Sequence, residues 1–273
     1  MEKKIGEAIK NGITDVLKGT RQVAMGVVDV VSGTVVKALE GMKDVQGAIG
    51  SVVVGAVSIV IKAAGAIGGD LTTVTKNAIV GIIKGVHEVG SVTTDTIRDS
   101  VHQAVKATAE IGGDVASVTK SAIVGAIVGT RDIAVSSEDA AAEAARGAIR
   151  AVSEVGSDAG QAAKNAVKGA IGGVAETSGQ LTAVIKNTSK GLVLGASEFG
   201  GDIAHVAKNA VLGSVEAAKE IGISAEEAAS AAATGAIEAA QAIGGKAVST
   251  VRKAITGTIG GVWVTIKEPF RKK

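Results

Sequence analysis

The chain has 273 residues, a formal net charge of +2 and no cysteine; 46% of its residues are hydrophobic but only 1% are aromatic. The apolar content is inconsistent with simple disorder, and 38 glycines with a single proline exclude collagen and a proline-rich linker. Disulfides and thiolate metal sites are excluded by the absence of cysteine. A nearly neutral chain with so few aromatic residues also lacks both usual features of a nucleic-acid-binding protein.

Residues 1–21 resemble a partial, lysine-rich copy of the repeat that follows, and we interpret them as an N-terminal cap. The lysines at the start are followed by no uninterrupted apolar core, so no secretory signal is predicted. The longest uncharged apolar run, residues 48–61, is shorter than the roughly 18–20 residues of a transmembrane helix. We therefore expect a cytoplasmic protein, either free or peripheral to a membrane.

Residues 22–265 contain eleven 22-residue repeats, the first beginning at Gln22. The eighteenth position is a large aliphatic residue in every repeat, starting with Leu39 and Ile61, and the thirteenth and twentieth are always Gly, Ala, Ser or Thr. Because 22 residues make six turns at about 3.67 residues per turn, each position keeps to one face of an α-helix. The sequence therefore predicts an all-α fold.

Turn signals divide this helical pattern. Gly-Gly-Asp occurs at 68–70, 112–114 and 200–202, and Gly-Ser-Asp at 156–158. In each, a glycine suits the C-terminus of one helix and the Asp suits the N-cap of the next. Their 44-residue spacing is typical of helix pairs whose two turns lie at opposite ends.

We therefore predict an array of antiparallel helical hairpins, packed through Gly and Ala, with little or no strand. The helices are expected near residues 70–88, 92–110, 114–132, 136–154, 158–176, 180–198, 202–220 and 224–242. The alternative is a few very long continuous helices.

Glycine recurs at the sixteenth position of the repeat. A glycine inside a helix costs about 1 kcal/mol relative to alanine, so repeated glycines indicate places where another helix backbone comes close. We predict a helix-packing seam at Gly81, Gly125, Gly147, Gly169, Gly191, Gly213, Gly235 and Gly257.

No constellation in the sequence predicts a catalytic, cofactor or metal site. His87, His102 and His205 occupy different repeat positions without metal-ligand spacing. Carboxylates at the first position are interpreted as a solvated rim. Basic residues at the eleventh position form a row interpreted as salt bridging between repeats, with anionic lipid or another polyanion as the alternative. That row is Lys76, Arg98, Lys120, Lys164, Lys186, Lys208 and Arg252. Residues 266–273 follow as a basic tail.

The stretches 74–81 (VTKNAIVG) and 83–86 (IKGV) carry a family resemblance. Rich in Val, Thr, Lys and Gly, they resemble the 11- or 22-residue amphipathic repeats of exchangeable apolipoproteins and of the perilipin and synuclein group. This resemblance implies helices that reversibly coat a lipid surface.

Two functions follow as expectations. The first is a non-enzymatic structural scaffold, without cofactors, that assembles with itself as a closed oligomer or a filament. It is favoured because only the charged ends, residues 1–10 and 267–273, are available to cap the apolar array. The second is a lipid- or membrane-surface-binding protein. An enzyme or small-molecule-binding module is a third class, which would need a pocket that interrupts the repeat.

Overall fold

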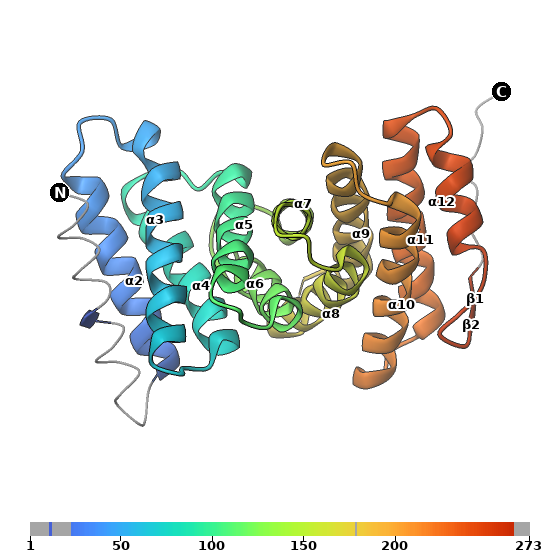
Figure 1. The fold of residues 1–273 in the computed structure, drawn as a ribbon, viewed down its shortest axis with the longest axis horizontal. Helices are drawn as coiled ribbons and strands as arrows, with labels where there is room; N and C mark the ends of the chain where they lie inside the picture. Colours follow the sequence, from blue (N-terminus) through green and yellow to red (C-terminus); the bar gives the residue numbers. More distant parts are fainter. Residues whose placement is uncertain (1–10, 13–22, 178, 265–273) are drawn as a thin grey trace.

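The computed structural model describes residues 11–12, 23–177 and 179–264, and shows helices packed side by side along an arc from α2 to α12 (Figure 1). In this view α7 is seen end-on while α3 and α11 lie closer to the plane, so the helix direction rotates along the array. The expected cap and tail fall almost wholly outside the described residues. Within these, the elements are α2 (Val23–Glu40), α3 (Val45–Ala66), α4 (Leu71–Val89), α5 (Thr94–Glu110), α6 (Val115–Gly129), α7 (Ser137–Glu154), α8 (Ala159–Thr177), α9 (Leu181–Glu198), α10 (Ile203–Ile221), α11 (Ala225–Ile243), α12 (Ala247–Ile255), β1 (Gly257–Ile259) and β2 (Val262–Val264).

The helices form two layers. Through most of the array each helix packs most extensively against the helix two places along the chain, so even-numbered helices form one layer and odd-numbered helices the other. Consecutive helices contact one another across the layers through smaller surfaces. Each interior helix therefore has neighbours on several sides and buries more than one face.

The predicted all-α architecture and the turns are confirmed. Asp70, Asp114 and Asp202 cap α4, α6 and α10 by accepting hydrogen bonds from backbone N–H groups of the first turn. Gly112 adopts the left-handed φ of 71° expected of a helix-ending glycine, and Gly68, Gly156 and Gly200 behave alike. Since no helix continues through 112–113 or 200–201, the long-helix alternative is wrong.

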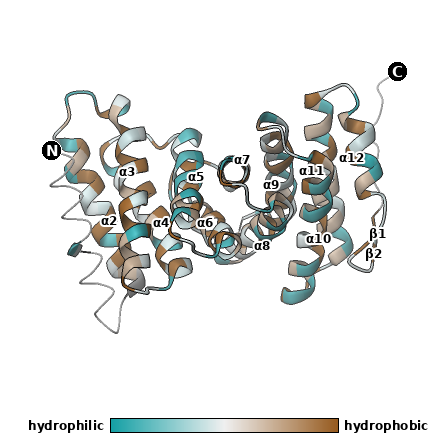
Figure 2. Ribbon diagram, in the orientation of Figure 1, coloured by the Kyte–Doolittle hydropathy of each residue, from teal (hydrophilic) through white to brown (hydrophobic). Residues whose placement is uncertain are grey.

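The core is built from Val, Ile and Ala. Aliphatic residues at the eighteenth position are buried from Leu39 to Ile259, and Ile61, Ile83 and Ile127 are fully inaccessible. Figure 2 shows hydrophobic and hydrophilic residues on every helix, as expected for helices with one buried side. Among the described residues the exposed large apolar side chains are few: Met25, Val54, Ile67, Phe199, Ile221 and Trp263.

The end of the array differs from the expectation of eleven helical repeats. Helix α12 stops at Ile255, and β1 and β2 follow as an antiparallel hairpin in which Thr258 is paired with Trp263. The turn is Gly260-Gly261, and both glycines have positive φ, as two-residue hairpin turns require. Ile259 and Val262 are buried, and the hairpin packs on α10 and α11. The helical prediction for the last repeat is therefore confirmed for α12 and wrong after Ile255.

Candidate functional site

Seven of the eight glycines of the predicted seam lie on helices and face the backbone of another helix. A Cβ atom added to Gly125 would lie 2.6 Å from the carbonyl oxygen of Lys76, and one added to Gly213 would lie 2.5 Å from that of Lys164. Such contacts are too short for a real side chain, so the two helix backbones touch without one between them. Five more glycines make the same contact with the preceding helix of their layer: Gly81, Gly147, Gly169, Gly191 and Gly235.

Gly257 does not share this environment. It lies in β1 with a φ of 111°, and a Cβ placed on it would meet no atom within 4 Å. Its assignment to a helix-packing seam is therefore wrong, since it serves the transition from α12 to the hairpin.

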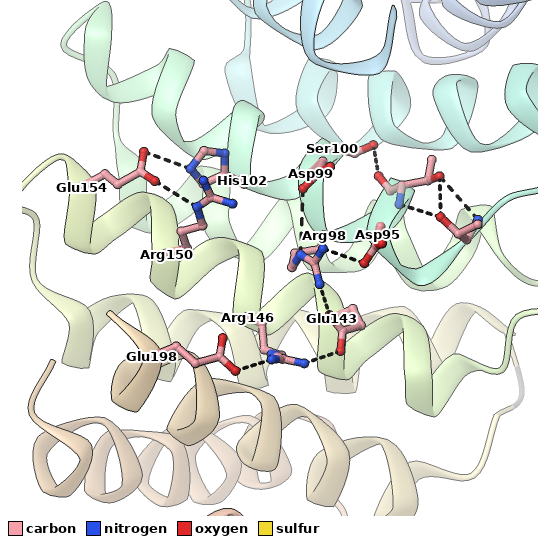
Figure 3. Close-up of polar contacts among 12 residues, drawn as sticks. Asp95, Arg98, Asp99, Ser100, His102, Glu143, Arg146, Arg150, Glu154 and Glu198 are labelled. Carbon is pink, nitrogen blue, oxygen red and sulfur yellow. Dashed lines mark hydrogen bonds and ion pairs between the residues drawn. The ribbon is translucent and has the colours of Figure 1, made fainter. Parts of the chain in front are cut away.

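Ion pairs cross the same helix layers. In the odd layer, Arg98 of α5 lies 3.2 Å from Glu143 of α7, and Glu143 also receives a hydrogen bond of 2.8 Å from Arg146 (Figure 3). Arg146 then pairs with Glu198 of α9. This chain of charges links α5, α7 and α9, which are successive helices of the odd layer.

Glu154, at the end of α7, is the most strongly perturbed carboxylate of the network. It lies 3.0 Å from Lys106 and 3.1 Å from His102, both on α5, and 2.9 Å from Arg150 (Figure 3). Burial alone would raise the pKa of Glu154, but the hydrogen bonds from Lys106, Arg150 and His102 outweigh it and lower the pKa to about 2. Sequence periodicity placed this carboxylate on a solvated rim and missed its partners.

The even layer carries equivalent pairs. Lys164 and Lys168 of α8 both contact Glu216 of α10, at 2.7 Å and 2.9 Å. Lys76, near the start of α4, reaches Glu176 at the end of α8 at 2.7 Å, past the intervening α6. At these positions, and at Lys186 on α9, the basic row makes inter-repeat salt bridges.

A groove lies open at the α2–α3 end of the array. It has a volume of about 640 Å³ and lies between the two helices, with Asp99 of α5 as its one charged lining residue. The lining includes Val52, Ala56 and Ile59, which occupy positions 9, 13 and 16 of the repeat. On α7 and α9 the same positions are buried beneath the preceding odd helix. On α3, Ala56 is buried but Val52 and Ile59 are only partly buried, and no preceding odd helix is among the described elements.

Helices α2 and α3 also lack the lysine and asparagine that several later helices carry at two positions of the repeat. Positions 11 and 12 are Ser32-Gly33 on α2 and Val54-Gly55 on α3. The corresponding pair is Lys-Asn on α4, α8, α9 and α10, where each Asn side chain donates a hydrogen bond to the carbonyl four residues earlier. Comparing these two positions along the sequence could have identified the unusual surface, but the sequence reasoning did not.

The remaining polar features form no recognisable reaction centre. Burial lowers the pKa of His102, an effect that neighbouring Glu154 opposes. His205 lies 3.4 Å from Asp158 on the surface of the array. No group of three or more His, Asp or Glu side chains that could hold a metal ion occurs in the described residues. A second hollow, of about 710 Å³, lies beside exposed Trp263 and is lined by α9 and α11.

One described helix, Val45–Ala66, is long and apolar enough to cross a membrane by length and composition, and 44% of its most apolar window is buried in the fold. A core helix of a soluble protein can meet the same criteria. No protein-family model and no curated protein matches the sequence.

Proposed function

We propose that the chain is a non-enzymatic structural scaffold that assembles with itself. Its unit is a helical hairpin made of two 22-residue repeats, and small residues let the helices of each layer pack closely. The single observation that carries self-association is the apolar groove between α2 and α3, which the described residues leave open. An array that leaves such a groove at one end needs a partner there to exclude water from it.

The distribution of contacts supports a rigid scaffold. Glycine contacts hold neighbouring backbones of a layer together, and ion pairs such as Arg98–Glu143 connect the same helices at their polar surface. Many charged side chains thus have partners in adjacent repeats. A rigid, regularly spaced array suits a structural role.

Sedimentation velocity across a dilution series from low to high micromolar tests the proposal, without lipid or detergent. We expect a species heavier than the monomer at high concentration that dissociates on dilution. A single monomeric species throughout the series would contradict self-assembly.

A second candidate function, binding to a lipid surface, is favoured by α3. This helix has one charged residue, Lys62, in 22 residues, and Val54 and Gly50 are exposed on its outer side. Circular dichroism with and without anionic vesicles distinguishes the two functions. A scaffold is fully helical in buffer, whereas a lipid coat gains helicity or co-floats with vesicles when they are added.

A further inference from the structure

We infer that the groove between α2 and α3 is occupied by α3 of a second copy of this chain, giving a two-fold symmetric dimer joined at the α2–α3 ends. This inference rests on the proposed self-association and specifies its interface. The groove is lined by positions 9, 13 and 16 of α3, the positions that are buried against the preceding odd helix on α7 and α9. The next odd helices occupy such sites: α5 packs on α7, and α7 on α9.

The internal contacts of the array show what kind of helix fits. Where one helix packs on the next in its layer, a glycine accepts the approaching backbone, as Gly125 does for Lys76. On α3, Gly50 and Gly55 have no atom within 4 Å of an added Cβ. These two glycines lie at positions 7 and 12 of the repeat and not at the sixteenth, but each leaves the backbone of α3 open to approach, and the described part of the chain does not fill that space.

Charge selects among the helices that the chain could supply. The groove has one charged lining residue, Asp99, so a charged side chain that entered it would lose hydration with a single possible partner. The N-terminal segment, residues 1–21, contains eight charged residues, whereas α3 contains only Lys62. A groove with one charged residue beside a helix with one charged residue is largely apolar on both sides, and two such surfaces can pack on each other as an isologous interface requires.

The opposite end of the array explains why the assembly would be closed. There the hairpin of β1 and β2 packs on α10 and α11, and Lys219 donates a hydrogen bond of 2.7 Å to the carbonyl oxygen of Gly260. Buried Ile259 and Val262 cover the apolar surface at that end. Filaments need two complementary open ends, and only the α2–α3 end shows an open apolar groove of this kind in the described residues.

The test restores the residues that later helices carry at the same two positions. In the full-length chain, Val54→Lys with Gly55→Asn gives α3 the Lys-Asn pair of α4. The matched control, Ser249→Lys with Thr250→Asn, makes a similar change on two exposed residues of α12. We expect the first variant to dimerise roughly tenfold or more weakly, because two larger polar side chains would stand where the α3 helices of the two copies meet, while the control dimerises like the parent.

A cross-linking measurement defines the symmetry. The chain has no cysteine, so Val54→Cys supplies one thiol per copy, and a disulfide can form only between two copies. Oxidation should yield a covalent dimer of Val54→Cys, but not of the exposed α12 control Ser249→Cys.

The outcomes separate the two proposals. If the parent is oligomeric and the Lys-Asn variant assembles equally well, or Val54→Cys gives no covalent dimer, this interface is wrong and self-association stands. If the parent is monomeric at every concentration, the proposed scaffold assembly fails too. If that monomer binds anionic vesicles and the Lys-Asn variant does not, lipid is the occupant and the dimer is refuted.

Discussion

Two glycines of α8, three residues apart, allow helix packing to be separated from helix propensity. A Cβ at Gly169 would overlap the carbonyl oxygen of Lys120 on α6 and come within 3.1 Å of Ile123 Cβ. At Gly172 the nearest atom is Val124 Cγ2, at 3.9 Å, an ordinary van der Waals contact. Alanine at the two positions therefore changes the same helix in the same way, except for the contact with α6.

The free energies of unfolding of the two variants should differ by the cost of crowding at the contact between α8 and α6. Replacing glycine with alanine in a helix interior contributes about 1 kcal/mol of favourable propensity at both sites. For Gly172→Ala we expect about that much stabilisation. Gly169→Ala must also move α8 away from a backbone that cannot rotate aside, and overpacking of this kind costs about 1–3 kcal/mol. We expect Gly169→Ala to be less stable than Gly172→Ala by about 1–3 kcal/mol.

Urea denaturation followed by far-UV circular dichroism measures this difference. The two variants and the parent are compared at one low concentration, so that self-association contributes equally little to each. Equal stabilities for Gly169→Ala and Gly172→Ala would refute the argument, because they would show that α6 and α8 do not require glycine at their contact.

Three further predictions concern other parts of the array. Glu154→Gln should make the stability of the fold depend less on pH between about pH 4.5 and 2 in acid unfolding. A carboxylate whose pKa is lowered in the folded state stabilises the fold above its ordinary pKa of 4.5, and this stabilisation is lost as the pH falls to about 2. Because Glu154 is partly exposed, we expect the stabilisation to be about 1–2 kcal/mol. Asp114→Ala should cost about 1 kcal/mol in thermal or urea unfolding, since the carboxylate caps α6 by accepting from two backbone N–H groups. In the hairpin, Val262→Asp should destabilise the fold by about 2–4 kcal/mol in urea unfolding, whereas Trp263→Ala should change it little, because Val262 is 5% exposed and Trp263 is 68% exposed.

Helix positions were predictable because local signals determine them. The glycine and Asp turns lie where the repeat places them, and helices α6 to α11 begin within a residue or so of the predicted starts. Burial of the eighteenth position was also predictable, since a large aliphatic residue that keeps to one helix face marks the side that packs. Both inferences need only neighbouring residues and the period of a helix.

The partners of the charged residues could not be predicted from periodicity. Lys76 and Glu176 are 100 residues apart and meet past α6. Which carboxylate a lysine reaches depends on the stagger between helices of one layer and on the curvature of the array. Neither quantity is encoded in the residue pattern of a single repeat, so the sequence predicted the basic row but not its specific pairs.

The sequence of the final repeat is ambiguous, because Gly257 fits both the helical repeat and a β-hairpin. Gly257 continues the sixteenth-position glycines, but Gly260 and Gly261 follow within four residues, and the neighbouring residues are β-branched except for Trp263. Closely spaced glycines among Thr, Ile and Val favour a tight hairpin over a helix. Here the local signal outweighed the repeat.

The α2–α3 end departs from the array through two related changes. The sixteenth position of α5, which faces toward α3, is Gln103 rather than glycine, and that of α3 itself is Ile59. Accordingly α3 and α5 pack through a smaller surface than α5 and α7 do. Val54 stands where α5 carries Arg98 and α9 carries Lys186, so α3 lacks a charge from the basic row, as α7 and α11 do at Ala142 and Ser230. At α3, the first described odd helix, apolar residues thus replace the glycine and the charged residue through which other helices of the array are joined. These apolar residues line an open groove. This is the pattern expected of a helix whose packing partner comes from outside its own array.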